Sequence, residues 1–122
     1  MNLLKGKVRG AGESENYSRK RPLVSIITVV KNGGPDLKRT IKSTLSQDYS
    51  NIEYIVLDGG STDSTIDIIK EFDDDINIWM SERDDGIYDA MNKGIKLSNG
   101  SIIGFINSGD WYFPDTISRV VN

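Results

Sequence analysis

The sequence predicts an α/β fold in which helices cover both faces of a mostly parallel sheet. Short apolar runs alternate along the chain with stretches in which apolar residues recur every three or four positions. Strands that alternate with helices are joined by crossover connections, and such connections place neighbouring strands parallel. The chain has 122 residues, which is the length of a single domain.

The four predicted strands are short and rich in β-branched residues, as expected for strands that are buried on both faces. They cover residues 23–30, 52–57, 76–80 and 102–106. Residues 1–21 contain glycines, serines and charges of both signs without a periodic pattern, so we expect a flexible leader there. The ordered domain is therefore expected to cover residues 22–122.

The first two predicted helices follow polar breaks in the chain. Pro35 suits the first turn of a helix. The apolar stripe of this helix consists of Leu37, Ile41 and Leu45. Ser61 or Thr62 is expected to cap the second helix. Its expected buried residues are Ile66, Ile69 and Phe72.

A third helix is predicted over residues 86–97, because apolar residues and glycine recur there at helical spacing. These residues are Ile87, Ala90, Met91, Gly94 and Ile95. Asn99 and Gly100 form a suitable stop for this helix. Pro114 and Asp115 are expected to open a last helix, and the acidic run 73–75 is expected to be a solvated turn.

The composition excludes several kinds of chemistry. The chain contains no cysteine and no histidine, which rules out disulfides, thiolate zinc sites and imidazole acid–base catalysis. The formal net charge of −3 argues against binding to a nucleic-acid backbone. Apolar runs fall short of the roughly 20 residues that a membrane-spanning helix needs, and the N-terminus lacks the apolar stretch of a signal peptide. We therefore expect a cytoplasmic protein.

Small, polar or acidic residues follow each predicted strand. In parallel sheets, ligands bind outside the carboxyl ends of the strands, so these segments form the expected site. They are residues 31–34, 58–61, 81–85 and 107–110. Four such segments on one edge predict a site lined by carboxylates and accessible backbone.

Three of these segments have both a functional and a structural interpretation. Gly59 allows a ligand to approach the backbone before a helix N-terminus that can hold an anion, but the segment is also an ordinary strand-to-helix turn. Asp84 can accept hydrogen bonds from ribose, base or sugar hydroxyls, or it can simply stabilise a helix N-terminus. Asp110 can bind Mg²⁺ or Mn²⁺, although an aspartate in a turn is usually a turn residue. The glycine signatures of dinucleotide and nucleoside-triphosphate sites are both absent.

Taken together, five segments resemble the N-terminal half of a family 2 glycosyltransferase of the GT-A fold. The segments are PLVSIITVVKN (22–32), STLSQDY (43–49), IEYIVLDGGSTDST (52–65), SERDDGIYDAMNKGI (81–95) and IIGFINSGDWYFPD (102–115). The resemblance covers residues 22–122 in the order and spacing of the family. The string GIYDAMNKGI is typical of members that build bacterial surface polysaccharides.

The resemblance implies a Rossmann-like transferase domain that binds a nucleotide-diphosphosugar donor, most often a UDP-sugar. The residues that it implies for donor binding are Val29, Asn32, Asp58, Gly59, Asp84, Asn92, Lys93, Asn107 and Ser108. Asp110 matches the last aspartate of the family's metal-binding motif and is therefore the expected ligand of Mn²⁺ or Mg²⁺.

The sequence departs from the family pattern at three positions. Gly59 stands where many members have a second aspartate, Gly109 where many have another metal-site aspartate, and Lys31 where a tyrosine is frequent. With a single carboxylate at position 110, we expect the metal to bind mainly together with the diphosphate and water. The acceptor site and the catalytic base are expected beyond Asn122, because family members continue well past this point.

Three functions follow from this comparison. The first is an inverting, metal-dependent glycosyltransferase of cell-surface polysaccharide synthesis, in which this chain binds the donor and a longer parent transfers the sugar to a saccharide or lipid-linked acceptor. The second is a non-catalytic nucleotide-sugar-binding fragment that lacks the acceptor half and the base. The third is an oligomeric α/β module without a ligand. Peripheral association with the inner face of the membrane and an oligomeric state are both compatible with the first function.

Overall fold

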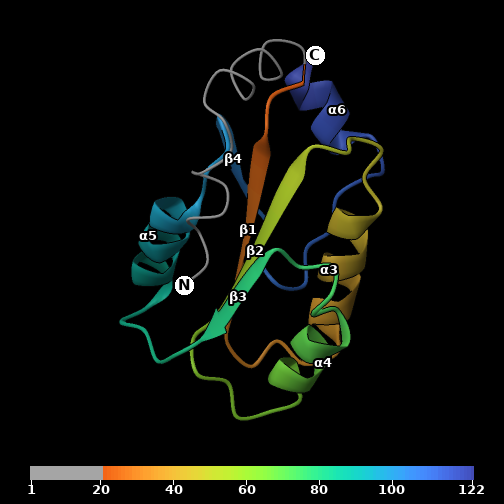
Figure 1. Cartoon of the computed structure of the whole chain (residues 1–122). Helices are drawn as coiled ribbons and strands as arrows, with labels where there is room; N and C mark the ends of the chain where they lie inside the picture. The colour runs from red at the N-terminus through yellow and green to blue at the C-terminus, as the bar shows by residue number, and fades with distance from the viewer. Residues whose placement is uncertain (1–20) are drawn as a thin grey trace.

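The computed structural model describes residues 21–122 and confirms the predicted α/β class (Figure 1). The predicted leader lies outside the described residues except for Arg21, whose guanidinium group donates a hydrogen bond to Ser50 Oγ (2.5 Å). The strands are β1 (Val24–Val30), β2 (Ile52–Asp58), β3 (Ile78–Ser81) and β4 (Ile102–Phe105). The helices are α3 (Asp36–Leu45), α4 (Thr65–Glu71), α5 (Ile87–Leu97) and α6 (Thr116–Val121). All strand pairs are parallel, and the order across the sheet is β3-β2-β1-β4.

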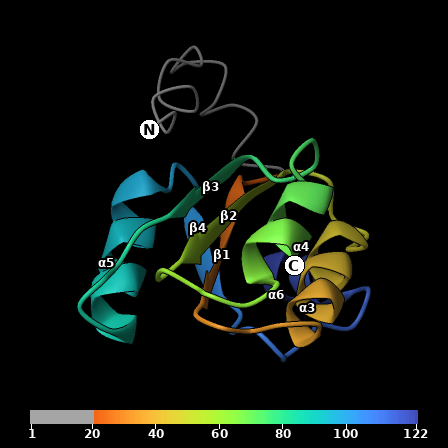
Figure 2. The same cartoon turned by 90° about the horizontal axis from the view of Figure 1, so that it is seen from below.

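Helices cover both faces of the sheet, as predicted. Figure 2 shows α3, α4 and α6 on one face and α5 on the other. Alternate residues of β1 point to opposite faces, so that Ile26 and Val30 pack with the α3 side while Ile27 and Val29 pack with α5. A Cβ at Gly94 would lie 2.7 Å from a methyl group of Ile27, so glycine lets α5 approach the sheet closely. The two-sided burial explains why β1 is an unbroken apolar run with two small hydroxyl residues.

The buried faces of α3 and α5 differ from the predicted stripes. Leu45 is 38% exposed, and Ile87 and Ile95 are 48% and 46% exposed. Residues spaced four apart drift by about 40° at each step around an α-helix, so a stripe of that spacing turns away from the sheet. Threonines complete the buried face of α3, and small residues complete that of α5. The buried residues are Leu37, Thr40, Ile41 and Thr44 in α3, and Ala90, Gly94 and Leu97 in α5.

The predicted start of the second helix is wrong. Neither Ser61 nor Thr62 caps α4, because that helix begins at Thr65. The Asp63 carboxylate accepts hydrogen bonds from both the amide (2.9 Å) and the hydroxyl of Thr65. Both bonds lower the pKa of the Asp63 carboxyl group, and the bond from the Thr65 hydroxyl contributes most. The predicted buried face was also partly wrong, since the buried residues of α4 are Thr65, Ile68 and Ile69, of which Ile69 alone was predicted.

Two titratable groups buried in the sheet have structural partners. Glu53, at the amino ends of the strands, accepts hydrogen bonds from Ser25 Oγ (2.8 Å) and from the backbone N–H of Asn99 (2.8 Å). Tyr54 shares a hydrogen bond of 2.9 Å with Thr28 Oγ1, and burial raises the pKa of its phenol group to about 12. Both groups therefore belong to the framework rather than to the predicted site, which lies at the opposite end of the strands.

Candidate functional site

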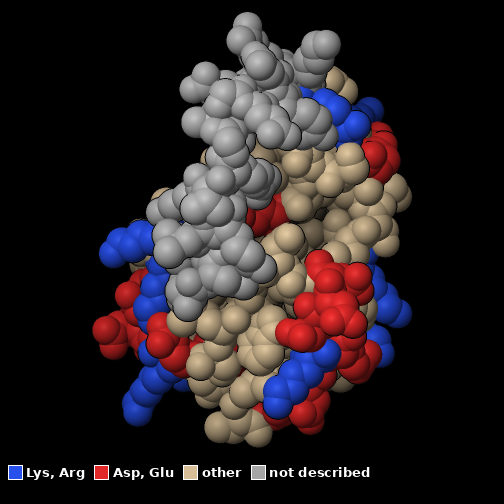
Figure 3. Space-filling view, viewed as in Figure 1, with Lys and Arg blue, Asp and Glu red and all other residues tan. Residues whose placement is uncertain are grey.

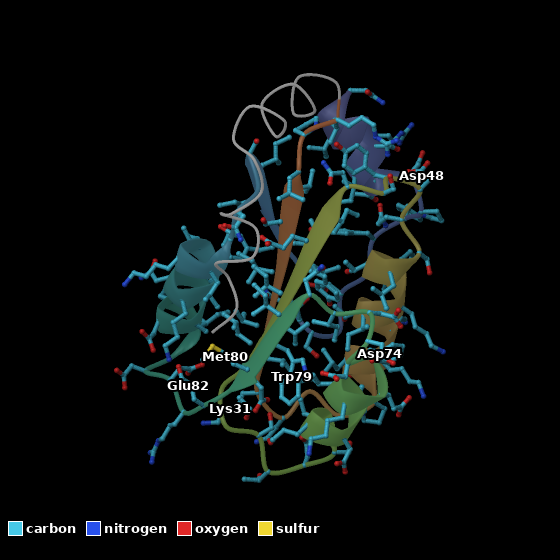
Figure 4. The ribbon with its side chains drawn as sticks, viewed as in Figure 1. Lys31, Asp48, Asp74, Trp79, Met80 and Glu82 are labelled. Carbon is cyan, nitrogen blue, oxygen red and sulfur yellow. The ribbon has the colours of Figure 1, made fainter. Side chains whose placement is uncertain are left out.

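The strand ends are aligned at one edge of the sheet. Val30 pairs with Asp58, and Asp58 pairs with Ser81, so three strands end in one row. The following loops stay attached to this row, because Gly59 N donates to Val30 O (2.8 Å) and Glu82 N donates to Asp58 O (3.0 Å). Figure 4 shows Glu82 near the lower end of β3. We call the four strand-end loops, residues 31–34, 58–61, 81–85 and 107–110, the rim.

Asp58 organises the second loop of the rim. Its side chain is nearly buried, with 2% of the residue exposed. Its carboxylate accepts hydrogen bonds from Gly60 N (3.1 Å), Ser61 N (2.9 Å), Ser61 Oγ and Ser81 Oγ (2.7 Å). Gly60 has a φ of +90°, a conformation that glycine adopts without steric cost. The carboxylate thus holds the loop from inside, and its expected contact with a donor stays a prediction.

Asn32 joins the first loop of the rim to the second. Its side-chain oxygen accepts a hydrogen bond from Thr62 N (2.8 Å), and its backbone N–H donates to Ser61 Oγ (2.7 Å). Its φ of 52° lies in the left-handed region, which asparagine tolerates better than most residues. Ser61 and Thr62 therefore hold the rim together instead of capping a helix.

Asp84 occupies the space above Gly59. A Cβ added at Gly59 would lie 2.7 Å from Asp84 Oδ2, so the carboxylate sits where a side chain at position 59 would begin. Asp84 is half-buried, and its other oxygen accepts a hydrogen bond from Gly86 N (3.0 Å). The third loop thus brings a carboxylate to the position at which the sequence lacks its expected second aspartate.

Lys93 forms ion pairs with Glu82 of the third loop and with Asp89 in the first turn of α5. Its ammonium group lies 3.1 Å from Glu82 Oε1 and 3.4 Å from Asp89 Oδ2. The hydrogen bond to Glu82, together with the charge of Asp89, raises the pKa of the Lys93 ammonium group. The Asp85 amide donates to Asp89 (3.0 Å) and is the main cause that lowers the pKa of the Asp89 carboxyl group. Lys93 is thus positioned by neighbouring acids, and the predicted donor contacts of Lys93 and the exposed Asn92 stay predictions.

The fourth loop meets the first at Ser108. A Cβ at Gly33 would lie 2.5 Å from Ser108 Oγ, so the two loops are in contact. Ser108 Oγ is buried and makes no hydrogen bond within residues 21–122. The Asn107 carbonyl accepts a hydrogen bond from Asp110 N (3.0 Å), which closes the turn. A hydroxyl without a partner is available to a ligand that reaches this point of the rim.

Asp110 is the expected metal ligand and is exposed. Its carboxylate has no hydrogen bond or ion pair within the part of the chain that the structure describes. That part contains no group of three or more acidic residues that could hold a metal ion by itself. A lone free carboxylate fits a hard divalent cation only as one ligand of several, with oxygens of a bound diphosphate and water completing the set.

The structure separates some predicted residues from the rim. The Val29 side chain is buried in the core beneath α5, where only its main chain is near the strand end. The acidic run forms an exposed turn, as predicted, in which Asp73 accepts a hydrogen bond from Trp79 Nε1 (2.6 Å). Figure 4 shows Asp74 beside α3 and α4. In the view of Figure 3, acidic and basic side chains are intermixed on the described part of the surface.

Sequence reasoning missed several hydroxyl residues. Thr65 Oγ1 accepts hydrogen bonds from the amides of Gly33 (3.0 Å) and Gly34 (3.2 Å), and Thr40 holds the fourth loop. Both threonines are fully buried. A threonine at a helix position that the apolar pattern assigns to the buried face is a signal for such a role, because a buried hydroxyl needs a hydrogen-bond partner.

A groove of about 450 Å³ beside α3 was also missed. It is lined by Arg39, Lys42, Ser43, Ser46 and Trp111.

A parallel α/β sheet with acidic, glycine-containing loops at its carboxyl edge defines a Rossmann-like ligand-binding domain. The glycosyl transferase family 2 model matches residues 25–122, and the chain therefore belongs to that family. None of the helices within residues 21–122 has the length and apolar character needed to cross a membrane.

Relatives of known sequence are longer than this chain. A glycosyltransferase of Mycobacterium tuberculosis (strain H37Rv) is 40% identical over 102 residues, which cover 82% of this chain and 39% of that protein. A PGL/p-HBAD biosynthesis glycosyltransferase of Mycobacterium bovis is 36% identical over 103 residues, which cover 81% of this chain and 40% of that protein. The chain thus spans about two-fifths of the length of these relatives.

Solved structures share the fold at low sequence identity. Mannosyltransferase PcManGT from Pyrobaculum calidifontis, in complex with GDP-Man and Mn²⁺, has a TM-score of 0.77 and 20% identity, with coverage of 98% of this chain and 40% of that one. Staphylococcus aureus TarS 1-349, in complex with UDP-GlcNAc, has a TM-score of 0.74 and 22% identity, with coverage of 80% and 29%. These similarities confirm the GT-A architecture.

Proposed function

We propose that this chain forms the donor-binding part of an inverting, metal-dependent glycosyltransferase. The donor is a nucleotide-diphosphosugar, most simply a UDP-sugar, and the acceptor is a saccharide or lipid-linked saccharide of the cell surface. The joined rim carries the proposal, because its four loops contact one another and leave the Asp110 carboxylate without a partner within residues 21–122. The nucleotide-sugars bound by the two structural neighbours support this class of donor.

The rim provides groups for the donor and for its leaving diphosphate. In an inverting transfer, the acceptor hydroxyl attacks the anomeric carbon from the face opposite the diphosphate, and a base takes its proton. Asp84 accepts hydrogen bonds from the nucleoside, and the Ser108 hydroxyl donates one to a donor oxygen. Asp110 would hold a divalent cation, whose charge stabilises the departing diphosphate.

A non-catalytic nucleotide-sugar-binding fragment is the second candidate. The chain spans 39% of the length of the mycobacterial relative, so the activity of that whole protein is not assigned to this chain. Both candidates bind the donor at the rim. They differ in whether the purified chain hydrolyses a UDP-sugar or transfers its sugar to an acceptor, which an assay for released UDP decides.

Calorimetric titration of the purified chain with UDP tests the shared part of both proposals. We expect binding in the presence of Mn²⁺ and an affinity about tenfold lower in EDTA, a difference of about 1.4 kcal/mol. The cation links the diphosphate to Asp110, so its removal leaves only the contacts to the loops. Absence of UDP binding under both conditions would show that the rim is not a donor site.

Replacing Gly59 by alanine tests the placement of Asp84. The new Cβ would lie 2.7 Å from Asp84 Oδ2, so it must push the carboxylate away from its position over the loop. Because a hydrogen bond to a charged group contributes about 1.5–3 kcal/mol, we expect both Gly59→Ala and Asp84→Ala to weaken UDP binding by about tenfold or more. The measurement is the dissociation constant for UDP in the presence of Mn²⁺.

The double variant distinguishes a shared cause from two separate ones. If both substitutions act by removing the same carboxylate, Gly59→Ala combined with Asp84→Ala should bind UDP no more weakly than Asp84→Ala alone. Thermal unfolding followed by circular dichroism controls for damage to the fold. Additive losses of affinity would show that Gly59→Ala does not act by displacing the Asp84 carboxylate.

A further inference from the structure

Every polar backbone group of the Gly109–Asp110 dipeptide forms a hydrogen bond. Gly109 N donates to Thr40 Oγ1 (2.9 Å), and Asp110 O accepts the Thr40 hydroxyl proton (2.7 Å). Gly109 O accepts a hydrogen bond from Arg39 Nη2 (3.2 Å), and Asp110 N donates to Asn107 O (3.0 Å). Thus all four backbone polar groups of the dipeptide have partners, and one side-chain oxygen supplies two of these hydrogen bonds.

In contrast to the backbone, the side-chain positions of this dipeptide have no partners within residues 21–122. Gly109 has no side chain, and a Cβ built on it would meet no atom within 4 Å. The carboxylate of Asp110 is exposed and has no partner within residues 21–122. The loop therefore presents one free carboxylate on a backbone that is fixed before any ligand arrives.

Thr40 is suited to fix this loop because it is itself immobilised. It is fully buried on α3, between the core residues Leu37 and Ile41. Arg39, the other α3 residue that reaches the dipeptide, is exposed and makes one longer bond. The neighbouring helical positions continue the same pattern, since Ser43 Oγ accepts a hydrogen bond from Tyr112 N (3.2 Å). Three polar side chains of α3 thus hold the loop that follows β4 by hydrogen bonds, namely Arg39, Thr40 and Ser43.

We infer that Thr40 is a positioning residue that sets the Asp110 carboxylate for a divalent cation, an inference that rests on the proposed function. Two carboxylates can share the coordination of a cation, so that neither has to be placed tightly. A single carboxylate gains more from a backbone that is already ordered, because ordering a residue at the moment of binding costs conformational entropy. The two hydrogen bonds of Thr40 order the backbone of this loop during folding, before the cation binds.

Valine and serine at position 40 separate the two parts of the threonine side chain. Thr40→Val keeps the volume and removes the hydroxyl, whereas Thr40→Ser keeps the hydroxyl and removes the methyl group. Removal of a group that orients a metal ligand typically lowers metal affinity by about 10–100-fold. Thr44→Val is the matched control, because Thr44 is buried on the same helix and its hydroxyl donates to Thr40 O (3.2 Å) rather than to the loop.

The test uses the full chain and two measurements. The first is the dissociation constant for Mn²⁺ with UDP present, taken from the paramagnetic resonance signal of free Mn²⁺. The second is the exchange rate of the Gly109 amide hydrogen without any ligand. We expect Thr40→Val to weaken Mn²⁺ binding by about 10–100-fold and to accelerate this exchange, whereas Thr40→Ser and Thr44→Val stay near wild type.

Two results would overturn the inference while leaving the proposed function intact. One is unchanged Mn²⁺ affinity in Thr40→Val, and the other is an equal loss in Thr40→Ser. A wild-type chain that binds no Mn²⁺ with UDP would instead refute the metal-dependent function, and the role of Thr40 with it. If Thr40→Val fails to fold, Gly109→Ala provides the test from the loop side, since alanine disfavours the φ of +98° at that position. Unchanged Mn²⁺ affinity in Gly109→Ala would overturn the inference.

Discussion

Replacing Asp110 by asparagine is expected to abolish the effect of Mn²⁺ on UDP binding. The variant keeps the size of the side chain and the hydrogen bonds of the backbone, but it removes the charge that a hard cation requires. Its UDP affinity in Mn²⁺ should fall to the level that wild type shows in EDTA, a loss of about tenfold or more, corresponding to at least about 1.4 kcal/mol. Calorimetric titration with UDP in Mn²⁺, in Mg²⁺ and in EDTA measures this loss.

Asp74→Asn is the matched control for this experiment. Asp74 lies in the exposed turn between α4 and β3, so its substitution changes the net charge equally without touching the rim. We expect the control to retain the full metal effect. A metal effect that persists in Asp110→Asn would assign the cation to another ligand.

Replacing Asp58 by alanine is expected to produce the largest loss of stability among the rim residues. The carboxylate accepts hydrogen bonds from two backbone amides and two serine hydroxyls, and 2% of the residue is exposed. Leaving a buried donor without a partner costs about 1–3 kcal/mol, although some of these donors will regain water. We therefore expect the free energy of unfolding to fall by about 3 kcal/mol.

Urea denaturation followed by circular dichroism measures this change through the midpoint and the slope of the transition. Asp74→Ala should unfold near the wild-type midpoint. Asp58→Asn should also be destabilised, because its amide nitrogen turns a donor toward groups that are themselves donors. A wild-type midpoint in Asp58→Ala would show that the loop does not depend on this carboxylate.

The two glycines that depart from the family pattern have different surroundings. At Gly59, the Asp84 carboxylate fills the space that a side chain would enter. At Gly109, the corresponding space is open, but the φ of +98° disfavours any residue with a Cβ. At the first departure a carboxylate of a neighbouring loop thus lies in the space of the missing side chain, whereas the second leaves Asp110 as the single carboxylate of its turn.

The fold and the place of the site followed from the sequence to a large extent. Within residues 21–122, the four strands and α5 lie close to their predicted ranges, because strand and helix periodicities differ strongly and Asn32, Pro35 and Gly100 separate the elements. The position of the rim followed from the parallel arrangement, since the carboxyl ends of parallel strands share one edge. Glycosyl transferase family 2 membership, suggested by five short strings, is confirmed by the match over residues 25–122.

Helix boundaries and faces were less accessible to sequence reasoning. Ser61 and Thr62 have the chemistry of helix caps, yet both form hydrogen bonds with Asn32 in another loop. A capping residue satisfies local backbone donors, and the sequence does not reveal that a distant residue competes for the same side chain. For the same reason, the exposure of Leu45 depends on how α3 is rotated against the sheet.

The sequence alone determined which side chains this protein can use: carboxylates, hydroxyls and amides, without cysteine or histidine, placed directly after four strands. Only the tertiary structure decided what each of them does. It buries Asp58 as the support of a loop, sets Asp84 over Gly59, pairs Lys93 with two acids and leaves the Asp110 carboxylate without a partner within residues 21–122. The contacts of Asp58 with Ser81 and of Asp84 with Gly59 join loops that follow different strands, and local residue patterns carry no information about such contacts.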